Sequence, residues 1–165
     1  MKTVSGIFDN RITADKAVSE LLDEGFVKDD ISLIMSDKTR ERLFSSTDDE
    51  ANRVAKGGLS GAAIGGALGA LIAGLTMVGG IVVPGAGLLV VGPLVAALSG
   101  AGAGATLGGL SGALINAGFA ADEANRYENE IKRGKAVVIV HASNPERIAI
   151  AQNALRSCGA ITEAA

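Results

Sequence analysis

The feature that most constrains this chain is a long segment, residues 57–121, without a single Asp, Glu, Lys or Arg. By contrast, residues 1–56 carry 12 acidic and 9 basic side chains, and residues 122–165 carry 6 of each. The middle segment also holds 19 of the 23 glycines. Charge and glycine content change together at both boundaries, so we divide the chain into two charged segments and one uncharged insertion.

The first charged segment has the pattern of a strand, a helix and a second strand. Residues 3–8 are rich in apolar and β-branched residues and run into the turn pair Asp9-Asn10, which predicts a strand closed by a turn. Apolar residues at helical spacing over residues 14–22 predict an amphipathic helix. Alternation over residues 31–36 then predicts a half-buried strand. A capping-box pattern at residues 47–50 indicates a lead-in helix that continues to Lys56.

The last charged segment repeats the order after a return helix, expected over residues 122–133. Residues 136–140 are a continuous apolar run and predict a buried strand, and Asn144 with Pro145 predicts the start of a helix. Ile161-Thr162 begins a short final strand. Strand-helix-strand twice is the order of an α+β, ferredoxin-like sandwich with both helices on one face of the sheet. The uncharged segment is then an insertion between the second and third strands.

Two tracks of glycine at four-residue spacing predict that the insertion is a glycine-zipper helical hairpin. Glycines four residues apart line one side of a helix and let another backbone approach closely. Glycine costs about 1 kcal/mol relative to alanine in a helix, so these helices need lipid or partner helices. The expected arms, residues 57–78 and 93–119, are each long enough to cross a bilayer core. The helix-packing and oligomerisation residues are Gly57, Gly61, Gly65, Gly69, Gly100, Gly104, Gly108 and Gly112.

The expected connection between the arms, residues 79–92, is also uncharged, whereas a tip in water is usually polar. We therefore expect a buried tip, either inside a bilayer that the hairpin enters and leaves by one face or in the dry centre of a many-chain particle. The tip residues are Pro84, Gly85, Gly87 and Pro93. Basic residues bracket both ends and place the charged halves in the cytosol in the membrane reading. They are Arg53, Lys56, Arg126, Lys132 and Arg133.

Composition argues against several classes of function. One cysteine, Cys158, and one histidine, His141, exclude an intramolecular disulfide and a thiolate or multi-histidine metal centre within one chain. A net charge of −3 and few aromatic residues argue against nucleic acid as a partner. Residues 100–104 are glycine-rich, but no Lys-Ser/Thr pair follows as in a phosphate-binding loop. We therefore assign no catalytic, cofactor-binding or metal-binding residues and expect no cofactor and no enzymatic activity.

Several stretches of the chain resemble the bacterial heat-induced general stress protein family (YflT-like). They are Val4-Ser5-Gly6-Ile7-Phe8-Asp9-Asn10 with Ala14, Ala17 and Val18, Val83-Pro84-Gly85-Ala86-Gly87, Gly92-Pro93-Leu94, and Glu123 to Glu128 with Gly134. The resemblance spans most of the chain. It implies a bacterial, stress-linked, non-enzymatic protein and carries over no catalytic residue.

Three functional readings remain open. We favour a structural stress protein that self-assembles as a homo-oligomer through the hairpin, at or in the cytoplasmic membrane, with its charged domains in the cytosol. Its start, residues 1–8, contains no long apolar region of a signal peptide. The first alternative is a soluble cytoplasmic homo-oligomeric particle or shell with the hairpins in a closed apolar interior. The second is a ligand-sensing ferredoxin-like module that the hairpin only tethers to the membrane.

Overall fold

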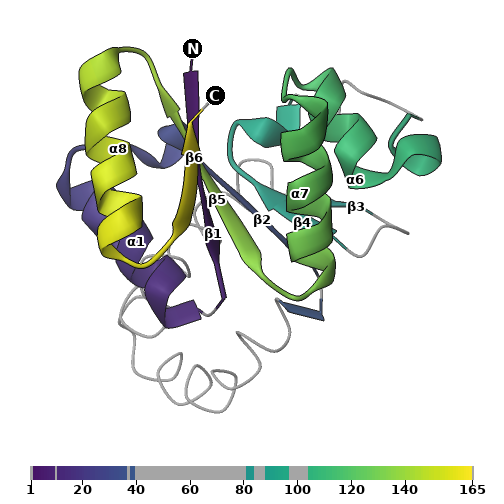
Figure 1. Cartoon of the computed structure of the whole chain (residues 1–165), viewed down its shortest axis with the longest axis horizontal. Coiled ribbons are helices and arrows are strands. Elements are labelled where there is room, and N and C mark those ends of the chain that lie inside the picture. Colours follow the sequence, from purple (N-terminus) through teal and green to yellow (C-terminus); the bar gives the residue numbers. More distant parts are fainter. Residues whose placement is uncertain are drawn as a thin grey trace, which may run out of the picture.

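The computed structural model describes residues 2–9, 11–36, 38–39, 81–83, 88–96 and 104–164 (Figure 1). The lead-in helix expected over residues 47–56 and the first hairpin arm, residues 57–78, lie outside these residues. The elements are β1 (Lys2–Phe8), α1 (Arg11–Asp23), the 3-10 turn η1 (Lys28–Asp30), β2 (Ile31–Ser36), β3 (Ile81–Val83), β4 (Leu88–Val91), α6 (Gly104–Asn116), α7 (Ala121–Lys132), β5 (Ala136–Ala142), α8 (Pro145–Ser157) and β6 (Ile161–Ala164).

The strands form one six-stranded antiparallel sheet in the order β3-β4-β2-β5-β1-β6. Its centre joins the two charged segments, because β1 pairs with β5 along its whole length, from Lys2 opposite Ala142 to Phe8 opposite Ala136. The first and last segments therefore fold as one unit although residues 57–121 separate them in the sequence. The predicted α+β class and the strands expected at both ends of the chain are confirmed.

Helices α1 and α8 cover one face of the sheet, and they contact each other there (Figure 1). The side chains pointing to this face from alternate positions of the strands are buried against the apolar stripes of both helices. Asn144 begins α8 as predicted, since its Oδ1 accepts the Arg147 backbone N–H at 2.8 Å. The core of this face includes Val4, Phe8, Val18, Leu21, Leu33, Val138, Val140 and Leu155.

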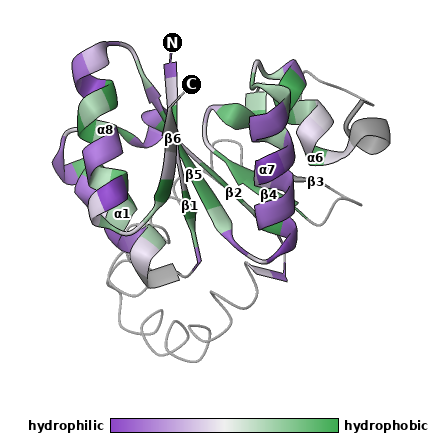
Figure 2. Ribbon diagram, viewed as in Figure 1, coloured by the Kyte–Doolittle hydropathy of each residue, from purple (hydrophilic) through white to green (hydrophobic). Residues whose placement is uncertain are grey.

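Helix α7 and part of α6 cover the opposite face, so the sheet lies between two helical layers. Figure 2 shows the central strands largely in green and much purple on the visible sides of α1, α8 and α7. Helix α7 buries Ala124, Tyr127 and Ile131 at helical spacing and exposes Asp122, Asn125 and Lys132 on its other side. The core of this second face also includes Ile7, Ile34, Val90, Leu94, Leu110, Leu114, Val137 and Ile139.

Covering of both faces corrects the expected half-buried strand at residues 31–36. The first five residues of β2 are all buried, because Ile31, Leu33 and Met35 face α1 and α8 while Ser32 and Ile34 face the second layer. The polar residue in this alternating pattern, Ser32, therefore makes a buried polar contact on the second face and does not face solvent.

The expectation that residues 79–92 only connect the two hairpin arms is also corrected, since this stretch contributes β3 and β4 to the sheet. Strand β4 pairs antiparallel with β2, from Leu33 opposite Val91 to Ser36 opposite Leu88. Pairing with the edge of β2 provides hydrogen-bond partners for the backbone of β4. This uncharged strand is therefore buried without lipid or a partner chain. The predicted burial of this stretch is confirmed at Leu89, Val90 and Val91, but the burial is within the domain itself.

Candidate functional site

The structure describes only part of the predicted helix-packing set. Gly57, Gly61, Gly65, Gly69 and Gly100, and the tip residues Pro84, Gly85 and Gly87, lie outside the described residues. The remaining track glycines, Gly104, Gly108 and Gly112, all lie in α6. The last tip residue, Pro93, is exposed in the turn that follows β4.

Helix α6 has one buried side and one open side after its midpoint. Leu110, Ala113 and Leu114 are buried against the second face of the sheet. On the open side, Ile115 is 44% exposed, and a methyl group added at Gly112 would meet no atom within 4 Å. The described part of the chain therefore leaves the Gly112 side of α6 free of close packing.

Helix α6 is interrupted at Gly109, whose φ of 65° and ψ of −167° are not helical. A methyl group at this position would lie 3.1 Å from Glu128 Oε1 of α7. Glu128 Oε2 accepts the backbone N–H of Ser111 at 2.7 Å, and Lys132 Nζ pairs with Oε1 at 2.5 Å. A carboxylate from α7 thus caps the part of α6 that follows the interruption.

These contacts determine the protonation state of Glu128. Burial raises the pKa of this carboxyl, but hydrogen bonds from Lys132 and Ser111 outweigh burial and lower the pKa to about 2, from an ordinary value of 4.5. Glu128 is therefore ionised throughout the physiological pH range.

We expect the contribution of Glu128 to stability to depend on pH with a definite sign. A lowered carboxyl pKa stabilises the fold fully above about pH 4.5, and this stabilisation is lost as the pH falls toward 2. Glu128→Gln should lower the free energy of unfolding by about 1.5 to 3 kcal/mol at pH 7, and the difference from the wild type should shrink below pH 4.5. Urea unfolding at stepped pH measures it, with the exposed Glu24→Gln as control. A difference that stays constant down to pH 3 would contradict this assignment.

A buried polar chain fastens α7 to the sheet. The Tyr127 hydroxyl donates to Glu123 Oε1 on its own helix, so the Ser5 hydroxyl of β1 donates to Tyr127 Oη. Tyr127 is fully buried, and its ring meets Phe119 edge to face at a centroid distance of 6.0 Å. This chain fixes α7, and with it Glu128, relative to the sheet.

A second polar contact on the same face involves the single histidine. The Leu94 N–H donates to Ser32 Oγ at 3.2 Å, and Ser32 Oγ lies 3.0 Å from His141 Nε2. Burial lowers the pKa of His141, and this effect outweighs the negative charge of Asp30, which raises the pKa. When His141 is neutral, its Nε2 accepts a hydrogen bond from the Ser32 hydroxyl. Ser32 is fully buried, so this pair joins β2, β5 and the turn after β4 rather than presenting a nucleophile to solvent. Sequence reasoning missed this partner of His141.

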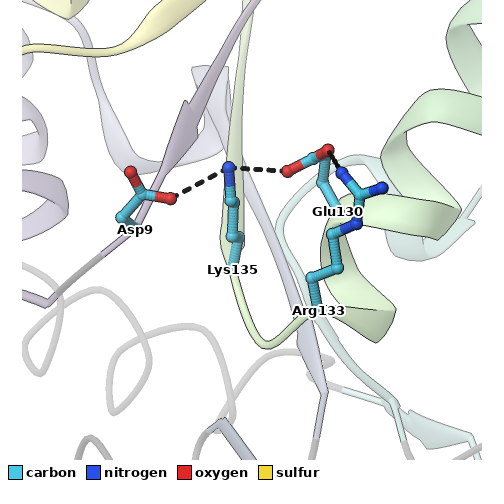
Figure 3. Close-up of polar contacts among 4 residues, drawn as sticks. All are labelled: Asp9, Glu130, Arg133 and Lys135. Atoms are coloured by element: carbon cyan, nitrogen blue, oxygen red, sulfur yellow. Dashed lines mark hydrogen bonds and ion pairs between the residues drawn. The ribbon is translucent and has the colours of Figure 1, made fainter.

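Charged side chains form a network where β1 and α7 end and β5 begins (Figure 3). Lys135 Nζ lies 2.9 Å from Asp9 Oδ1 and 2.7 Å from Glu130 Oε2, and Arg133 pairs with Glu130 Oε1 at 2.7 Å. Hydrogen bonds with Glu130 and Asp9 raise the pKa of Lys135, and the bond from Lys135 lowers the pKa of Glu130. Lys132 is likewise paired with Glu128. Two of the basic residues expected to flank a membrane, Lys132 and Arg133, thus have acidic partners within the chain.

Cys158 ends α8 as a small core residue, 5% exposed. Its thiol donates to Glu20 Oε2 of α1 at 3.1 Å, and Ser157 Oγ donates to the same carboxylate. Burial and the neighbouring Glu20 raise the pKa of Cys158, while these hydrogen bonds lower the pKa of Glu20. A thiol with a raised pKa is a poor nucleophile, so the contact serves to join α1 and α8.

Two further observations concern the described residues alone. They contain no group of three or more His, Cys, Asp or Glu side chains placed to hold a metal ion. Within the same ranges, every helix falls short of the combined length and apolar character needed to cross a membrane.

Comparison with known proteins bears on the resemblance noted in the sequence. Residues 3–83 match the family model described as heat induced stress protein YflT domain. The match covers β1, α1, β2 and β3, and it ends before the stretches of residues 92–94 and 123–134 that also carry the resemblance. Neither the curated proteins nor the solved structures gave a significant match. The match to the heat induced stress protein YflT domain over residues 3–83 therefore confirms the predicted resemblance to this family in that part of the chain.

Proposed function

We propose that this chain is a non-enzymatic structural protein of the stress response that self-associates through its uncharged segment at the cytoplasmic membrane. The YflT match supports the link to stress. The observation that carries self-association is the open Gly112 side of α6 in a segment that has no charged residue. Uncharged helices with glycines four residues apart gain stability by pairing with one another, which makes a second copy of the chain the natural partner.

We further propose that the two charged segments form a ferredoxin-like domain. The strand order β6-β1-β5-β2, with antiparallel neighbours and with α1 and α8 on one face, supports this assignment. In this scheme everything between β2 and β5 is inserted. The insertion first adds β3 and β4 to the edge of the sheet and then covers its second face with α6 and α7.

A specific observation favours the soluble particle as a second candidate. Strand β4 and the part of α6 after Gly109 bury their apolar side chains on the domain's own sheet, without lipid. If the first glycine track packs in the same way against other copies, the uncharged segment fills a protein interior instead of a bilayer. Both candidates share self-association and differ in what surrounds the glycine tracks.

Substituting one glycine in each track tests self-association. Gly65→Leu and Gly108→Leu place a branched side chain where close backbone approach is needed, so we expect both variants to lose the assembly that the wild-type chain forms. Light scattering during size exclusion measures the mass in each case. Ala63→Leu and Ala105→Leu add similar bulk outside the tracks and should leave the mass unchanged.

The outcomes separate the readings. An unchanged assembly in both glycine variants would refute the role of the tracks. Loss of membrane attachment with no change in mass would favour the tethered, ligand-sensing module. A loss of mass that is limited to the glycine variants supports self-association through the tracks.

A further inference from the structure

We propose that Glu128 is an autoinhibitory latch: by holding α6 bent at Gly109, it keeps the glycine track of α6 from forming one continuous stripe for a second copy of the chain. This inference rests on the proposed self-association through the glycine tracks. It concerns the junction of α6 and α7, which lie side by side (Figure 1).

The bend divides the track. In a continuous helix, residues four apart follow one another along the same side, so Gly104, Gly108 and Gly112 would form a single stripe. The non-helical φ and ψ of Gly109 lie between the second and third of these residues. The track is therefore broken in the described conformation, although all three glycines belong to α6.

The Ser111 amide shows why the bend persists. In a continuous α-helix this N–H would donate to the carbonyl of Leu107, four residues earlier. Here it donates to Glu128 Oε2 at 2.7 Å. The carboxylate thus replaces the helical acceptor, and a hydrogen bond to an ionised group is stronger than one to a neutral carbonyl. Without Glu128, the bent form leaves this N–H without its acceptor, and straightening supplies Leu107 instead.

The latch is held from the α7 side. Lys132, one turn after Glu128, pairs with Oε1, so both carboxylate oxygens are engaged. Tyr127 is buried and linked to Ser5 of the sheet. Glu128 is therefore carried on a helix whose position is fixed, and α6 is the helix that changes between the bent and the straight conformation.

Gly109 is the residue of α6 that allows the bend and lies against Glu128. Its positive φ is strained for any residue with a side chain, and a methyl group there would press on Glu128 Oε1 at 3.1 Å. In a continuous helix, by contrast, alanine is more favourable than glycine. Gly109→Ala and Glu128→Met therefore act on opposite partners of the contact and should both favour the straight helix.

The test measures conformation and assembly in the same samples. NMR chemical shifts of Gly109, or of the alanine that replaces it, report the backbone conformation, and exchange of the Ser111 amide reports its hydrogen bond. Light scattering across a dilution series gives the concentration at half assembly. In Glu128→Met and Gly109→Ala we expect helical shifts at residue 109 and half assembly at a concentration about tenfold lower than in the wild type.

Gly159→Ala is the matched control. Gly159 also has a positive φ, 80°, with no atom within 4 Å of an added methyl group, and it follows α8 on the other side of the sheet. It should lose stability without changing the assembly midpoint. If Glu128→Met does not fold, the comparison of Gly109→Ala with Gly159→Ala decides the question.

Each remaining result overturns the latch. A wild-type chain that assembles, together with variants whose midpoint or residue-109 shifts do not change, refutes the latch and leaves the proposed function intact. Wild type and variants that all stay monomeric at every concentration refute the proposed function and the latch together.

Discussion

Gly92→Ala should cost the fold about 3 to 5 kcal/mol of unfolding free energy. Gly92 follows β4 with a φ of 96°, and an added methyl group would lie 2.2 Å from the backbone oxygen of Ile31 and 2.8 Å from the Cα of Ser32. Both neighbours are backbone atoms of a buried central strand, so they cannot move aside. The turn after β4 crosses β2 this closely only because residue 92 has no side chain.

Urea unfolding of the purified variant measures this effect, and Gly25→Ala provides the control. Gly25 has a similarly positive φ of 80° but no atom within 4 Å of an added methyl group, so it should cost only about 1 to 2 kcal/mol. Equal losses in the two variants would contradict the close approach of the β4 turn to β2.

Tyr127→Ala should cost about 3 to 5 kcal/mol, because it removes a fully buried ring from the layer that covers the second face of the sheet. Tyr127→Phe keeps the ring and removes only the hydroxyl that links Ser5 to Glu123, so it should cost about 1 to 2 kcal/mol. Chemical denaturation of both variants separates the packing contribution from the hydrogen-bond contribution.

Asn125→Ala, on the exposed side of the same helix, serves as the control and should change stability by less than about 0.5 kcal/mol. A loss below 1 kcal/mol for Tyr127→Ala would mean that α7 is not part of the core. The proposal that the insertion covers the second face of the sheet with α6 and α7 would then be wrong.

Sequence patterns predicted the described parts of the charged segments well, because their elements have local signals in the sequence. The helix beginning at Pro145 has an N-cap and a proline at its first position, and β5 is a continuous apolar run. Apolar spacing likewise identified α1. These signals depend on residues close in sequence, so they survive without knowledge of the tertiary fold.

The insertion was harder to predict because short apolar runs suit a strand and a buried helix equally. Residues 81–83 and 88–91 were interpreted as the connection of a helical hairpin, yet they pair into the sheet. Their valine content and their glycine and proline neighbours were the available signal for strands. The choice was decided by the free edge of β2, which belongs to a different segment.

The contacts of the candidate site could not be predicted for a similar reason. Glycine spacing indicated a continuous helix, whereas the bend at Gly109 depends on a carboxylate from α7, 19 residues later. Likewise, Ser32 and His141 are 109 residues apart and meet only because β2 and β5 are neighbours in the sheet. Spacing in the sequence carries no information about such pairs.

The central claim, that this chain is a self-associating structural protein at the membrane, is tested most directly by fractionation without detergent. The lysate is separated by high-speed centrifugation, the membrane pellet is washed with carbonate, and the soluble fraction is sized with light scattering. We predict a carbonate-resistant pellet that contains the full chain. A large, monodisperse soluble species would support the particle instead, and a soluble monomer of 16.5 kDa at every concentration would contradict self-association in either form.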